Sequence, residues 1–195
     1  FRRVLFRSVE QFLSLSDTEQ LQTIKDLNDI GQEEIIIDVL TGVGIDNLSV
    51  PLLGELGRAY NNNDKPEEAI KVFKAIDTEH RDAVWHYRCA YSHGSIASTN
   101  HEAYTSENMQ QMLALVDNGV RLATKEGRND IKEYCFEVMD MCRLQMDFEK
   151  CEVDYPDLCL NYSKYIAEKK KKREGVPRQR TITVEEILAT DAMWT

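Results

Sequence analysis

The sequence has few residues that interrupt helices and none of the patterns that mark strands. Its 195 residues include nine glycines and four prolines. No segment alternates apolar and polar residues with the Val, Ile and Thr enrichment of a strand, and no pair of such segments is joined by an Asn-Gly turn. We therefore expect an all-α protein without a β-sheet.

Two further absences limit the function. No apolar run approaches the roughly eighteen residues of a membrane-spanning helix, so we expect no membrane partner. The sequence lacks the motifs G-x-S-x-G, G-x-x-x-x-G-K-[ST] and H-E-x-x-H, which mark serine hydrolases, nucleotide-binding loops and zinc proteases. The acidic pairs, such as Glu33 with Glu34 and Glu67 with Glu68, fall in predicted first helical turns, where they complement the helix dipole. The sequence thus predicts no enzyme and no cofactor.

The cysteines and histidines also lack a ligand pattern. Five cysteines make an odd number with no C-x-x-C pair, which favours buried free thiols in a reducing cytoplasm. His86 and His93 share a predicted helix face with Cys89 between them, and His101 follows in a predicted loop. These positions do not have the spacing of a four-ligand zinc site, so we expect no metal.

Charge is unevenly distributed and divides the chain. Residues 1–8 (FRRVLFRS) resemble the translated scar of a sequencing adapter, and we expect them to lie outside the fold. Residues 169–180 hold seven basic side chains and one acidic one, and they read as a basic linker. Residues 181–195 carry three acidic side chains and read as the first helix of a second domain. Taking these parts out of the net charge of −10 leaves −16 for residues 9–168.

An acidic body of this kind argues against a nucleic-acid partner, because binding to phosphates relies on Lys and Arg that release counterions. The one basic patch is the run Lys169–Lys172. Lysines at a helix end also stabilise that end through the helix dipole, and we prefer this interpretation. In the last segment, Thr183 and Glu186 form a capping box that opens a predicted helix over 184–194.

Residues 50–82 contain one copy of a helical repeat. Leu56, Gly57 and Tyr60 fall on one predicted helix, and Ala69 and Phe73 fall on the next. Small residues at Gly57 and Ala69 allow two antiparallel helices to approach closely. A step of about 34 residues finds degenerate neighbours on both sides.

In the preceding repeat Ile35 and Val39 take the second-helix positions, and in the following one Cys89 and Ala90 take first-helix positions. Residues 94–101 are turn-rich, so we expect a loop there that is enlarged by about fourteen residues. Further helices are predicted from about residue 106, over 131–148 and after residue 156, giving about eight helices in residues 14–168. The predicted core is Leu56, Tyr60, Phe73, Trp85, Val116, Val120 and Val138.

Residues 50–93 resemble a group of bacterial tetratricopeptide (TPR) repeat proteins. The resemblance is carried by PLLGELGRAYNN at 51–62, EEAI at 67–70 and AVWHYR at 83–88. The sequence departs after Arg88, where CAYSH replaces LGYAY but keeps the small residue Ala90. Residues 181–194 more briefly resemble the beginning of a bacterial domain related to acidic DNA-mimic proteins. The resemblance implies helical hairpins stacked as a short right-handed solenoid that binds protein segments on its concave face.

The TPR resemblance also implies which side chains face the concave side. They are Gly54, Arg58 and Asn61 in one repeat and Tyr87 and Tyr91 in the next. Tyr and Arg are frequent interface anchors, and Arg58 has the geometry to bind a partner carboxylate. We therefore predict a non-catalytic scaffold that binds a protein or peptide through Arg58, Asn61, Tyr87 and Tyr91.

Two other functions remain open. The first is an acidic immunity or DNA-mimic type protein that blocks a basic partner. The second is an enzyme whose active site lies in a further domain.

Overall fold

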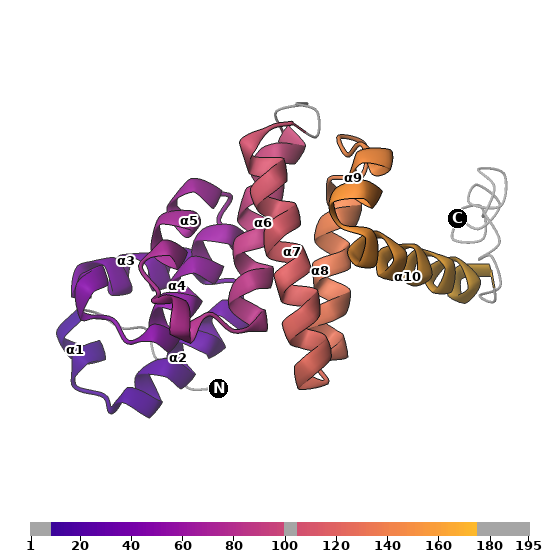
Figure 1. Ribbon diagram of the computed structural model, residues 1–195. Helices are drawn as coiled ribbons and strands as arrows, with labels where there is room; N and C mark the ends of the chain where they lie inside the picture. The colour runs from indigo at the N-terminus through magenta and orange to yellow at the C-terminus, as the bar shows by residue number, and fades with distance from the viewer. Residues whose placement is uncertain (1–8, 100–104, 175–195) are drawn as a thin grey trace, which may run out of the picture. The chain divides into compact units, whose positions relative to one another are not determined.

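The computed structural model describes residues 9–99 and 105–174, which form helices and contain no strand (Figure 1). The elements in order are α1 (Val9–Leu13), α2 (Asp17–Asp29), α3 (Glu33–Val43), the 3-10 helix η1 (Ile45–Asn47), α4 (Val50–Asn62), α5 (Pro66–Lys74), the 3-10 helix η2 (Thr78–His80), α6 (Ala83–Thr99), α7 (Glu107–Glu126), α8 (Asn129–Met141), α9 (Phe148–Asp154) and α10 (Pro156–Glu174). The all-α prediction is confirmed. None of these helices is long and apolar enough to cross a membrane.

Several helices begin and end at residues that the local sequence indicates. Ser16 and Glu19 form a reciprocal capping box at the start of α2, as predicted. Ser106 caps α7, because its hydroxyl accepts a hydrogen bond from the amide of Met109 at 3.2 Å. Gly127 ends α7 with φ of 70°, a left-handed conformation that glycine adopts at little cost.

The chain divides into two compact units, one ending at Leu160 and the other beginning at Asn161, within α10. In the first unit each helix from α2 to α8 packs against the next one. Alternate helices pack as well, with α2 on α4, α4 on α6 and α6 on α8. The helices of the first unit therefore follow one another in space in the same order as in the sequence (Figure 1).

The predicted core is largely confirmed. Leu56, Phe73 and Val116 are fully buried, as are Trp85, Val120 and Val138 to within a few per cent, whereas Tyr60 is half-buried at the edge of the cluster. Helices α4 and α5 approach closely at Gly57, where a Cβ would lie 2.4 Å from two ring carbons of Phe73. This glycine is therefore required by the contact, as the repeat pattern predicted.

The predicted loop over residues 94–101 is wrong for residues 94–99, which continue α6. Gly94 is not a turn residue. Its missing side chain makes room for α8, because a Cβ there would lie 2.9 Å from Met141 and 3.1 Å from Val138. The thiol of Cys142 also donates to the carbonyl oxygen of Gly94 at 3.3 Å. Here a tertiary contact overrides the local preference of glycine and serine for turns.

Three other boundaries differ from the prediction. The helix predicted over 131–148 ends at Met141, and a new helix begins at Phe148, capped by the side chain of Asp147 on the amide of Lys150. Helix α10 continues to Glu174, so residues 169–174 are helical where the sequence suggested a linker. The predicted scar at 1–8, His101 and the helix over 184–194 lie outside the described residues.

Candidate functional site

A groove of about 610 Å³ lies along α4, α6 and α8 in the first unit. These are alternate helices in the chain, and they also contact one another in pairs. The groove contains all four residues that the sequence analysis selected, Arg58, Asn61, Tyr87 and Tyr91. Its other lining residues are Asn62, Val84, Arg88, Arg128, Asp130, Ile131 and Tyr134.

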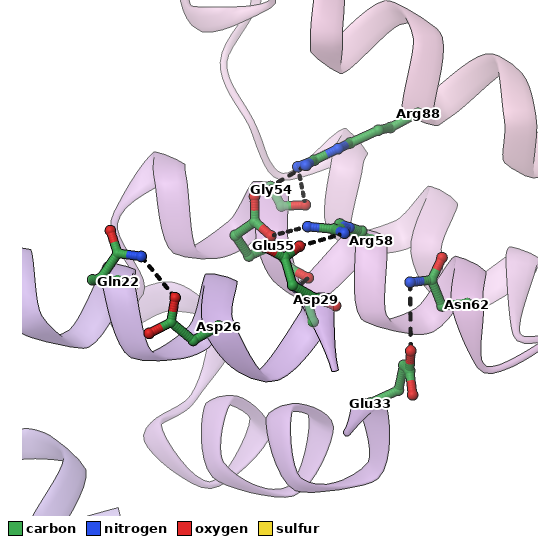
Figure 2. A network of polar contacts seen from close by, with 10 residues as sticks. Gln22, Asp26, Asp29, Glu33, Gly54, Glu55, Arg58, Asn62 and Arg88 are labelled. Atoms are coloured by element: carbon green, nitrogen blue, oxygen red, sulfur yellow. Dashed lines mark hydrogen bonds and ion pairs between the residues drawn. The ribbon is translucent and has the colours of Figure 1, made fainter. Parts of the chain in front are cut away.

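Arg58 already pairs with carboxylates of its own chain, which the sequence did not indicate. Its guanidinium donates to a carboxylate oxygen of Asp29 on α2 at 2.9 Å, and it lies 3.5 Å from Glu55 one turn earlier on α4. The Asp29 side chain is 65% exposed, so a partner carboxylate can compete with it. Figure 2 shows this pair at the side of the network around Glu55.

The polar network beneath the groove is centred on Glu55, a carboxylate that is almost fully buried. Asn28 of α2 donates to it at 2.9 Å, and Arg88 of α6 donates to it at 3.0 Å. Arg88 also donates to the carbonyl oxygen of Gly54 at 2.9 Å (Figure 2). Since a buried carboxylate needs partners to offset its lost hydration, Glu55 ties α2, α4 and α6 together.

Asn61 is buried between α4 and α6. Its amide donates to the carbonyl oxygen of Arg88 at 3.0 Å, and its own oxygen accepts from the hydroxyl of Ser92 at 2.7 Å. Asn61 therefore fixes the spacing of the two helices, and its surface in the groove is small.

The aromatic wall of the groove consists of Tyr87, Tyr91 and Tyr134. The rings of Tyr87 and Tyr134 stack with centroids 5.3 Å apart and planes 28° apart. Burial, followed by the neighbouring Tyr91, raises the pKa of Tyr87 above its usual range. Tyr134 is 44% exposed and faces the groove.

Arg128 and Asp130 form the edge of the groove at the junction between α7 and α8. The guanidinium donates to both carboxylate oxygens, at 3.0 and 2.8 Å. These hydrogen bonds hold the pKa of Asp130 below its usual range. The charged residues that line the groove are thus three arginines and one aspartate, whereas the whole chain has a net charge of −10.

A second hollow of about 380 Å³ shares Val84 and Arg88 with the groove and reaches Lys25 on α2. It is lined by Pro51, Gly54 and further residues of α4 and α6. Phe73 on α5 and His80 on η2 also line this second hollow.

The histidines of α6 are separate from the groove. Burial lowers the pKa of both His86 and His93. The Nδ1 atom of His86 is buried without a hydrogen-bond partner, and Nδ1 of His93 lies 2.9 Å from the side-chain oxygen of Asn108. Burial also raises the pKa of Cys89 to about 12. Within residues 9–99 and 105–174, no group of three or more His, Cys, Asp or Glu side chains is arranged to hold a metal ion.

The sequence analysis missed several lining residues, above all Arg88, Arg128 and Tyr134. One of them left a signal. Arg88 directly follows Tyr87, the first-helix position equivalent to Gly54, and its side chain donates a hydrogen bond to the carbonyl oxygen of Gly54. Arg128 and Tyr134 could not be predicted from the sequence, because their place in the groove depends on where α8 lies.

Compared with known protein families, with curated proteins and with solved structures, the chain matches none.

Proposed function

We propose that residues 9–168 form TPR-like repeats stacked as a short right-handed solenoid, and that the chain is a non-catalytic scaffold which binds a segment of another protein in its groove. The observation that carries this proposal is the groove itself. Four residues chosen only by their repeat positions, Arg58, Asn61, Tyr87 and Tyr91, line one hollow between alternate helices. The pairwise packing of α2, α4, α6 and α8 and the close contact at Gly57 also support it.

The lining suggests the chemistry of the bound segment. Tyr87, Tyr91 and Tyr134 present flat apolar rings with hydroxyl groups at their tips, which suits an apolar or aromatic side chain next to peptide groups. Arg58 and Arg128 lie nearby, and both pair with exposed or half-exposed carboxylates. A segment with an apolar residue flanked by an acidic one therefore complements the groove, with its carboxylate replacing Asp29 on Arg58.

The experiment begins with selection of binding peptides from a displayed random library on the purified chain. The dissociation constants of the selected peptides are then measured by fluorescence anisotropy for Tyr91→Ala, Tyr134→Ala and Arg58→Ala. The controls are Leu144→Ala and Arg121→Ala, two exposed side chains that do not line the groove.

Loss of a central anchor is expected to weaken binding by about 2–4 kcal/mol, or roughly thirty- to a thousand-fold. The controls should bind like the parent, and only variants with unchanged thermal stability are compared. If all five variants bind equally well, the groove is not the binding surface.

The acidic charge favours a second candidate, a protein that blocks a basic partner by mimicry. Its binding would rest on long-range electrostatics and would weaken steeply with salt. A titration against a basic protein between low and physiological salt, repeated with Tyr91→Ala, separates the two functions. A salt-sensitive affinity that Tyr91→Ala does not change supports mimicry.

A further inference from the structure

Two of the five cysteines form a pair that is independent of the groove. The sulfur atoms of Cys151 on α9 and Cys159 on α10 are 2.8 Å apart, across a separation of eight residues. Both side chains are buried, at 0% and 3% exposure. Two sulfur atoms in ordinary contact are further apart than this, and a disulfide bond of about 2.05 Å needs only a small movement of the side chains.

The other three cysteines have different neighbours. Cys142 donates to the carbonyl oxygen of Gly94. Cys135 packs at the missing side chain of Gly119, and Cys89 belongs to the apolar core around α4 and α5. Of the five cysteines, Cys151 and Cys159 are therefore the two whose sulfur atoms are placed to form a disulfide bond.

We propose that Cys151 and Cys159 are an oxidation site that closes to a disulfide when a small-molecule disulfide, such as glutathione disulfide, oxidises it. The thiolate of one cysteine attacks the sulfur–sulfur bond of the oxidant. A mixed disulfide forms, and the released thiolate takes up the proton that the cysteine lost. The second cysteine then loses its proton, attacks the mixed disulfide and releases the second small thiol. Two protein S–H bonds are replaced by one S–S bond, and the oxidant is reduced to two thiols.

The surroundings of the pair determine how fast this reaction runs. Burial raises the pKa of both thiols, and the thiol–thiol contact raises that of Cys151 further. Because the thiolate is the nucleophile, the folded chain should oxidise slowly, through transient opening of the short helix α9. The bond should be hard to reduce once formed, because its two sulfur atoms are already in place.

The test uses the whole chain and needs no variant for its main readout. The protein is incubated in glutathione buffers of increasing oxidised fraction, quenched with acid, unfolded and alkylated without reduction. Trypsin then gives one peptide, 151–164, that contains Cys151 and Cys159, and another, 133–143, that contains Cys135 and Cys142. The second peptide is an internal control for non-specific oxidation.

We expect peptide 151–164 to carry no alkyl group, and to be two hydrogen atoms lighter than its dithiol form, at an oxidised fraction where peptide 133–143 still carries two alkyl groups. A concentration of urea below the unfolding transition should accelerate this loss. In Cys159→Ser, Cys151 should be recovered as the alkylated form or as the glutathione adduct, which differ in mass.

Two results would overturn the proposal. One is full alkylation of peptide 151–164 across the whole series of buffers. The other is oxidation of peptides 151–164 and 133–143 at the same buffer composition, which would mean that the 2.8 Å contact gives Cys151 and Cys159 no advantage.

Discussion

Replacing Gly57 by alanine tests how α4 and α5 pack, because the substitution has two effects of opposite sign on the free energy of unfolding. Replacing a helical glycine by alanine stabilises a helix by about 1 kcal/mol through propensity alone. A Cβ at Gly57, however, would lie 2.4 Å from two ring carbons of Phe73, which is fully buried and cannot turn aside without disturbing the core. Overpacking of this kind costs about 1–3 kcal/mol, occasionally more. We therefore expect Gly57→Ala to lower the free energy of unfolding by up to about 2 kcal/mol.

Gly54 provides a matched control in the same helix. A Cβ there would have only an ordinary contact, 3.6 Å from the guanidinium of Arg88. Gly54→Ala should therefore raise the free energy of unfolding by up to about 1 kcal/mol. In thermal unfolding monitored by circular dichroism, each kcal/mol corresponds to about 2–4 °C for a domain of this size. Gly57→Ala should then unfold at a lower temperature than the parent and Gly54→Ala at a higher one.

A smaller residue opposite the new methyl group gives the second half of the test. Phe73→Leu alone should destabilise the chain, but combined with Gly57→Ala it should cost less than the sum of the two single changes. If Gly57→Ala is as stabilising as Gly54→Ala, then α4 and α5 do not approach each other as described, and the reasoning about the repeat is refuted.

The remaining predictions concern the core, the buried carboxylate and the histidines. Phe73→Ala should lower the free energy of unfolding by about 3–5 kcal/mol in urea titrations, because the side chain is fully buried; a loss below 1 kcal/mol would contradict this burial. Glu55→Ala should cost about 3 kcal/mol, since it leaves Arg88 without its carboxylate, and Glu55→Met combined with Arg88→Met should recover part of the loss. Burial lowers the pKa of His86 and His93, so the unfolded chain takes up protons first and stability should fall as pH decreases through about 6.5, the unfolded value. Thermal melts between pH 7.5 and 5.5 check this last prediction. The double variant His86→Gln/His93→Gln should show a shallower decrease, and an equal slope would show that other groups cause it.

The fold could be predicted from the sequence where a local signal and a tertiary contact agree. The capping box of Ser16 and Glu19 fixes the start of α2, and the small residue Gly57 opposite Phe73 fixes the α4–α5 contact. The prediction failed where they disagree. Gly94 belongs to a turn-like sequence, but it is helical because α8 packs against its bare Cα. A single sequence gives no information about that neighbour.

The candidate groove was predicted in part for a similar reason. Repeat positions select residues on one helix face, so Arg58, Tyr87 and Tyr91 could be found without knowing how far apart the helices lie. Tyr134 could not, because on α8 it occupies the boundary between the apolar side and the exposed side. Its place in the groove depends on its ring contact with Tyr87.

The polar contacts that join α2, α4 and α6 contain a signal that periodic apolar residues do not. Each of these contacts spans a sequence separation between 27 and 34 residues, close to the repeat length of about 34 that the sequence predicts. They are the pairs Asn28 with Glu55, Asp29 with Arg58, Asn61 with Arg88, Asn61 with Ser92, Gly54 with Arg88 and Glu55 with Arg88. Hydrogen bonds are directional, so such pairs fix the position of one helix along the next more narrowly than apolar packing does. Complementary polar residues about 27 to 34 positions apart, such as Glu55 and Arg88, are therefore a sequence feature that points to Arg88.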